Sequence, residues 1–173
     1  MKKSLPNVIV LTAICLITAL LLALVNSFTL PVIKAAEERA TQAALLEVLP
    51  SGGVFSKVDL ETAGLGSLSL ETEVEEIYQG SNGGYVVKVL TAGYSTGLQI
   101  MVGVNAEGKI EGSVCLASQE TLGYEKTYGE SLLGADLDTL SGIATVSGAT
   151  KTTTGYKKAA SDALKIAAAL SGN

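Results

Sequence analysis

The 173-residue sequence contains no histidine, no tryptophan and only two cysteines. Without histidine the chain lacks the commonest general base, the Ser-His and Cys-His nucleophile pairs and most zinc-binding ligand sets. Two cysteines are too few for a disulfide framework or an iron–sulfur cluster. We therefore expect no catalytic residue and no metal site in the chain itself, and any chemistry must come from a bound group.

Charge is also scarce, because only 17% of the residues are charged and twelve bases face seventeen acids, a net charge of −5. No basic run exceeds two residues, so binding of nucleic acid by neutralisation of phosphates is not expected. Hydrophobic residues make up 47% of the chain. This composition is too apolar for a disordered chain and raises the question of a membrane segment.

The apolar residues are concentrated near the start, where Val8 to Val25 form eighteen residues without a charge. As a helix this run is roughly 27 Å long, close to the hydrocarbon thickness of a bilayer. A cleaved signal peptide is the alternative, but the run exceeds the usual apolar length of such signals and no small-x-small site follows it closely. We expect a retained anchor in the lipid bilayer. Lys2 and Lys3 before it favour a cytoplasmic N-terminus and a C-terminal part outside the cytoplasm.

Three parts are predicted along the chain. Residues 1–30 form the cytoplasmic N-terminus and the transmembrane anchor. Residues 31–52, rich in alanine and leucine, form a helical stalk that either continues the anchor helix or follows a kink at Pro31. Residues 53–173 form an extracytoplasmic domain.

The extracytoplasmic domain has the pattern of strands in pairs followed by a helix. Alternating apolar residues predict one hairpin over 76–90, with its turn at Ser81–Gly84, and a second over 98–116, with its turn at Asn105–Gly108. Residues 152–170 carry an apolar, alanine-rich stripe at helical spacing. We expect an α+β fold of antiparallel hairpins packed with a C-terminal helix.

A run of small and hydroxyl residues, 147–154, precedes that helix. One interpretation, favoured by composition alone, is a helix N-cap supplied by a Ser or Thr side chain. The other is an anion site, because a glycine turn entering a helix presents unpaired N–H groups to a phosphate. The spacing of a P-loop is absent. The candidate binding residues are Ser147, Gly148, Ala149, Thr150, Lys151 and Thr152.

Ser147-Gly148-Ala149-Thr150 resembles the Ser/Thr-Gly-Ala-Thr flavinylation motif of the FMN-binding domain family. Gly93-Tyr94, followed by the hairpin strand and turn that end in Gly108-Lys109-Ile110, is similar to another family element. Glu120-Thr121-Leu122-Gly123 resembles the family's Glu-Thr-Pro-Gly element. Order and spacing agree over about residues 78–170. The family's best-known members are the G subunit of the Rnf electron-transport complex and the C subunit of the sodium-pumping NADH:quinone reductase.

The resemblance implies that a flavin transferase attaches FMN through a phosphoester to Thr150, with Glu120, Thr121, Leu122 and Gly123 in the flavin pocket. It implies a subunit, not catalytic alone, that relays electrons in an Rnf-type ion-translocating ferredoxin:NAD⁺ oxidoreductase. Its partners would be the other membrane and soluble subunits. The alternatives are a stand-alone membrane-anchored FMN protein for extracellular electron transfer, a C-type subunit of the quinone reductase, and a domain that has lost its flavin.

The sequence departs from the family pattern at two places. Ala144 stands where the family usually has Asp, three residues before the motif, and this bears on recognition by the transferase. Leu122 replaces the family's Pro, and Tyr124-Glu125 replaces Leu-Gly, which indicates a reshaped flavin pocket. Three tyrosines are candidates to stack on the flavin ring: Tyr94, Tyr124 and Tyr128. The alternative for each is an ordinary role in core packing or at the surface.

Overall fold

The computed structural model describes residues 5–61 and 63–172, and side chains from residue 8 onward except those of 34–37 and 62. Two compact units divide the chain, Met1–Gln42 and Ala43–Asn173. The topology signal at Lys2 and Lys3 lies outside the described residues.

The N-terminal apolar run is part of a single helix, α1 (Leu5–Val48), which also contains Pro31. The helix is long and apolar enough to cross a membrane. Its large apolar side chains from Val8 to Ile33 are exposed in the chain itself, as a lipid-facing helix requires. The helix runs without a break through Pro31 as far as Val48.

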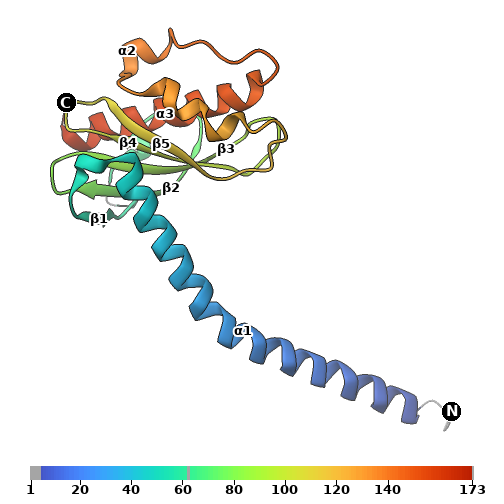
Figure 1. The fold of residues 1–173 in the computed structure, drawn as a ribbon. Helices are drawn as coiled ribbons and strands as arrows, with labels where there is room; N and C mark the ends of the chain where they lie inside the picture. The colour runs from blue at the N-terminus through green and yellow to red at the C-terminus, as the bar shows by residue number, and fades with distance from the viewer. Residues whose placement is uncertain (1–4, 62, 173) are drawn as a thin grey trace. The chain divides into compact units, whose positions relative to one another are not determined.

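The C-terminal unit is built on one antiparallel sheet in which each strand pairs with the next along the chain (Figure 1). Both predicted hairpins are confirmed as antiparallel pairs, and each pairing contains a register shift. The short edge strand β1 was not predicted. The strands are β1 (Phe55–Val58), β2 (Glu73–Gly80), β3 (Tyr85–Thr91), β4 (Leu98–Val104) and β5 (Ile110–Ala117).

The C-terminal helix α3 (Thr150–Ser171) packs on one face of the sheet, mainly against β3 and β4. Its small residues, including Ala159 and Ala163, form one core cluster with sheet residues such as Val87 and Ile100. Alanine on the helix lets its backbone approach the sheet closely, which explains the alanine-rich stripe. The predicted α+β class is confirmed, and α3 begins two residues earlier than predicted.

Short helical segments connect β5 to α3. They are the 3₁₀ segments η3 (Tyr124–Lys126) and η4 (Tyr128–Leu132) and the helix α2 (Leu137–Leu140). Two further 3₁₀ turns, η1 (Pro50–Gly52) and η2 (Leu65–Ser67), flank β1. Gly123, with a φ of +76°, turns the chain into η3, a conformation that favours glycine.

The last turn of α1 packs on the opposite face of the sheet, where Leu45, Val48 and Leu49 join a second apolar cluster. The backbone of Val48 crosses two glycines of the sheet. A Cβ at Gly103 would lie 2.1 Å from the Val48 carbonyl oxygen, and one at Gly112 would lie 2.8 Å from the same atom. Glycine at these positions in β4 and β5 is therefore required by the close approach of the helix.

Candidate functional site

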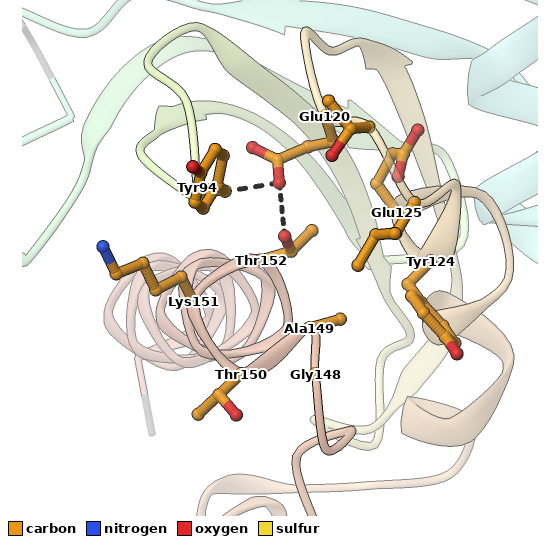
Figure 2. Close-up of a pocket in the computed structure, with 11 residues that line it drawn as sticks. Tyr94, Glu120, Tyr124, Glu125, Gly148, Ala149, Thr150, Lys151 and Thr152 are labelled. Atoms are coloured by element: carbon orange, nitrogen blue, oxygen red, sulfur yellow. Dashed lines mark hydrogen bonds between the residues drawn. The ribbon is translucent and has the colours of Figure 1, made fainter.

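A cavity of about 350 Å³ lies at the N-terminus of α3 (Figure 2). Three segments that are distant in sequence form its wall, namely the β3–β4 loop, the segment after β5 and the start of α3. Its volume falls at the lower end of the range for small-molecule and cofactor sites. The lining residues are Tyr94, Glu120, Thr121, Leu122, Tyr124, Glu125, Gly148, Ala149, Thr150, Lys151 and Thr152.

The start of α3 has no side-chain cap. Gly148 has a φ of +87° and turns the chain, Ala149 is the N-cap residue, and Thr150 is the first helical residue. The capping interpretation favoured by composition is therefore wrong, since no described side chain caps this helix. The first-turn N–H groups and the positive end of the helix dipole are therefore available to bind an anion.

The threonines of the first turn differ in what their hydroxyls contact. Thr152 Oγ1 donates a hydrogen bond to Glu120 Oε2, and Thr153 Oγ1 donates to the Ala149 carbonyl oxygen at 3.0 Å. Both of these side chains are buried. Thr150 is exposed, lines the cavity and makes only a long hydrogen bond of 3.4 Å to a backbone carbonyl. The accessible hydroxyl in the cavity at the helix start is that of Thr150.

Glu120 joins the three walls of the cavity. Its Oε1 accepts the Ser95 N–H at 3.0 Å, and its Oε2 accepts the Tyr94 N–H at 3.2 Å together with the Thr152 hydroxyl. Partial burial by itself would raise the pKa of Glu120, but these hydrogen bonds outweigh burial and lower it below the ordinary value. Gly93 permits the arrangement, because a Cβ there would lie 2.6 Å from Glu120 Oε1. The Glu120 carboxylate is thus hydrogen-bonded to donors of the protein itself.

The positively charged side chain of the cavity is Lys151, which lies on the opposite side from Tyr124 and Glu125 (Figure 2). The Lys151 ammonium is 5.5 Å from the centroid of the Tyr94 ring, within the range of a cation–π contact. Figure 2 shows both side chains beside the first turn of α3. Lys151 therefore places a positive charge beside Tyr94, on a residue of the first turn of α3.

The segment that leads into the motif is held by side chains of neighbouring elements. Lys157 Nζ donates hydrogen bonds to the Ser141 carbonyl at 3.1 Å and the Ile143 carbonyl at 2.6 Å. The Tyr128 hydroxyl donates to the Ala144 carbonyl at 3.0 Å. The Ala144 side chain itself is exposed. The backbone before Thr150 is consequently fixed while position 144 faces outward.

The structure brings most of the predicted site residues together. Of the ten, Ser147 and Gly123 do not line the cavity, and the other eight do. Among the tyrosines, Tyr94 and Tyr124 line it, whereas Tyr128 is buried in the core. Glu125 was not predicted as a site residue. Its only signal in the sequence was that it departs from the glycine of the family pattern.

A glycine turn that enters an uncapped helix beside a lysine, an accessible threonine and tyrosines defines a site for a phosphate-bearing, ring-containing cofactor. Comparison with protein families agrees, because residues 93–165 match the model of the FMN-binding domain. Residues 1–48 match the model of the RnfG N-terminal region. The resemblance to the FMN-binding domain family is confirmed, and the chain combines an apolar N-terminal helix with a domain similar to the FMN-binding domain.

A more specific likeness is to one characterised protein. The chain is 35% identical over 124 residues to the G subunit of the Na⁺-translocating ferredoxin:NAD⁺ oxidoreductase complex of Acetobacterium woodii. The aligned part covers 66% of this chain and 60% of that protein. This chain therefore matches less than two thirds of the length of its relative.

Proposed function

We propose that this chain carries FMN covalently at Thr150 and relays electrons as the G-type subunit of an Rnf-type ion-translocating ferredoxin:NAD⁺ oxidoreductase. The observation that carries the proposal is the accessible Thr150 hydroxyl, which lies in the cavity at an uncapped helix N-terminus. The FMN-binding domain match and the likeness to a G subunit support the same assignment.

In the proposed attachment, Thr150 Oγ1 loses its proton and takes the FMN phosphoryl group from FAD with the help of a flavin transferase. The new bond joins Oγ1 to phosphorus, the pyrophosphate bond of FAD breaks, and AMP leaves. The phosphoester keeps about one negative charge at the start of α3, a helix-end interaction typically worth about 0.3–1 kcal/mol. The covalent bond, rather than this energy, retains the cofactor outside the cytoplasm.

The residues of the cavity suit FMN by their chemistry. The first-turn N–H groups of α3 and the Lys151 ammonium would hold the phosphate. The rings of Tyr94 and Tyr124 and the apolar side chain of Leu122 would flank the flavin. Glu120 would keep these walls together through its three hydrogen bonds. The bound flavin supplies the redox chemistry, and the protein orients it and adjusts its potential.

Position in the membrane completes the proposal. The apolar part of α1 would anchor the chain in the lipid bilayer with its N-terminus in the cytoplasm, so that the FMN-binding domain is extracytoplasmic. Its partners would be the other membrane and soluble subunits of the complex. A reporter that is active only after export, fused after Asn173, should be active. An inactive export reporter, with a cytoplasm-only reporter active at the same junction, would reverse the topology.

The test of the cofactor assignment is flavin fluorescence in a denaturing gel. The full chain, produced together with a flavin transferase, should give a fluorescent band at its own mass under ultraviolet light, because the phosphoester survives denaturation. The same chain produced without the transferase is the matched control and should give a dark band. A dark band in both samples, with the chain present by staining, would contradict covalent flavin.

A further inference from the structure

Glu125 is a buried carboxylate in the cavity wall for which the attachment of the cofactor gives no reason. It lies in η3, is 3% exposed and lines the same cavity as Thr150 (Figure 2). Its Oε1 accepts a hydrogen bond from Ser118 Oγ at 3.1 Å. Its Oε2 is buried and has no hydrogen-bond partner within the described part of the chain.

A second buried carboxylate, that of Asp162, shows how this fold satisfies a structural one. Asp162 is fully buried, and its Oδ2 accepts the N–H groups of Glu71 and Thr72 and the Thr72 hydroxyl. Its Oδ1 forms an ion pair with Lys165 at 3.0 Å. Glu125 has one donor and, among the described residues, no ion pair. Leaving a buried acceptor without a partner destabilises the fold, so packing alone does not account for it.

Glu125 therefore presents to whatever occupies the cavity a carboxylate oxygen that has no partner among the described residues. Nearby ionisable groups do not cancel its charge, since Cys115 and Glu120 are not cations and Lys151 lies at the other end of the cavity beside Tyr94. Away from water, electrostatic interactions are stronger than at the surface. Electron uptake adds negative charge to a flavin, and a neighbouring carboxylate opposes it.

We propose that Glu125 lowers the redox potential of the flavin held in this cavity. The inference rests on the proposed function, because it requires flavin at Thr150. Glu125 acts through its charge and neither gains nor loses a bond. In the measurement below the electrode supplies the electrons. A lower potential would change the driving force for electron transfer between this subunit and its redox partners, and it would leave the attachment chemistry unchanged.

The test is a spectroelectrochemical titration of the flavinylated full chain at pH 7. Glu125→Gln keeps the size of the side chain and removes its charge, so its midpoint potential should be higher than that of the wild type. Glu130→Gln is the matched control, because it removes one charge from an exposed residue of η4 that does not line the cavity. Its potential should equal that of the wild type. The shift at Glu125 should also persist at high salt, since buried charges are screened little.

Equal potentials in the wild type and Glu125→Gln would overturn the inference, as would equal shifts in Glu125→Gln and Glu130→Gln. If the Gln variant does not fold, Glu125→Ala in the same titration decides the matter by the same criterion. Folded variants that carry no flavin, beside a flavinylated wild type, would assign Glu125 to attachment and would also contradict the inference. A wild type that never carries flavin refutes the proposed function, and the inference with it.

Discussion

Replacing Glu120 by glutamine tests whether one carboxylate holds the cavity together. The carboxylate accepts three hydrogen bonds, from Tyr94 N–H, Ser95 N–H and Thr152 Oγ1. The amide keeps one acceptor oxygen, so at least one of these bonds is lost and the others weaken. A hydrogen bond to a charged group is worth about 1.5–3 kcal/mol, and partial exposure of Glu120 favours the lower part of this range. We expect the free energy of unfolding to fall by about 2 kcal/mol.

The assay is thermal unfolding of the detergent-solubilised chain, followed by near-ultraviolet circular dichroism. A loss of about 2 kcal/mol should lower the Tm by roughly 6–10 °C in a domain of this size. Thr152→Val, which removes the hydroxyl donor to the Glu120 carboxylate, should cost about 1.5 kcal/mol. In the double variant the two losses should not add, because both substitutions break the same contact. Equal unfolding free energies for wild type and Glu120→Gln, or fully additive losses, would refute this reasoning.

The lowered pKa of Glu120 gives the sign of the pH dependence. A carboxylate whose pKa is lower in the folded than in the unfolded state stabilises the fold at pH values above its ordinary pKa of 4.5. This stabilisation is lost as the pH falls through the folded-state pKa. The difference in stability between wild type and Glu120→Gln should therefore be largest near neutral pH and should shrink below pH 4.5.

Three further outcomes are expected. Ala144→Asp should raise the flavinylated fraction when the transferase is limiting, because the side chain at 144 is exposed on a fixed backbone, and an unchanged labelling rate would show that Asp is dispensable. Cys115 should be an unpaired thiol whose pKa is raised by burial; it should alkylate slowly at pH 7, and mass spectrometry of the unreduced protein should find no intramolecular disulfide. Gly103→Ala should cost about 1–3 kcal/mol in unfolding, because its Cβ would collide with the Val48 carbonyl, and wild-type stability would contradict that packing.

Local patterns in the sequence were sufficient for most of the fold. Both hairpins follow from alternating apolar residues around Gly-rich turns, and α3 follows from its apolar stripe. The edge strand β1 (Phe55–Val58) could not be recognised, because four residues with a polar centre carry little periodicity. It exists because it pairs with β2, which begins fifteen residues after β1 ends. Pairing at that separation leaves no signal within the four residues themselves.

The sequence predicted which residues belong to the candidate site better than it predicted their contacts. The motif at Ser147–Thr150 located the start of α3, and the resemblance placed Glu120 in the same pocket. The sequence did not show that Glu120 accepts hydrogen bonds from the protein itself. Its partners Ser95 and Thr152 lie 25 and 32 residues away from it. Burial of Glu125 was equally invisible, since a Glu in a loop is ordinarily exposed.

The central claim is that Thr150 carries the flavin, and Thr150→Val tests it most directly. Valine keeps the size and branching of the side chain but removes the nucleophilic oxygen, so the fold should survive. Thr154→Val is the matched control, because Thr154 is exposed and does not line the cavity. After production with a flavin transferase, peptide masses should show the addition of FMN minus water in the wild type and in Thr154→Val. The adduct should be absent from Thr150→Val, and a full FMN adduct on that variant would contradict the account.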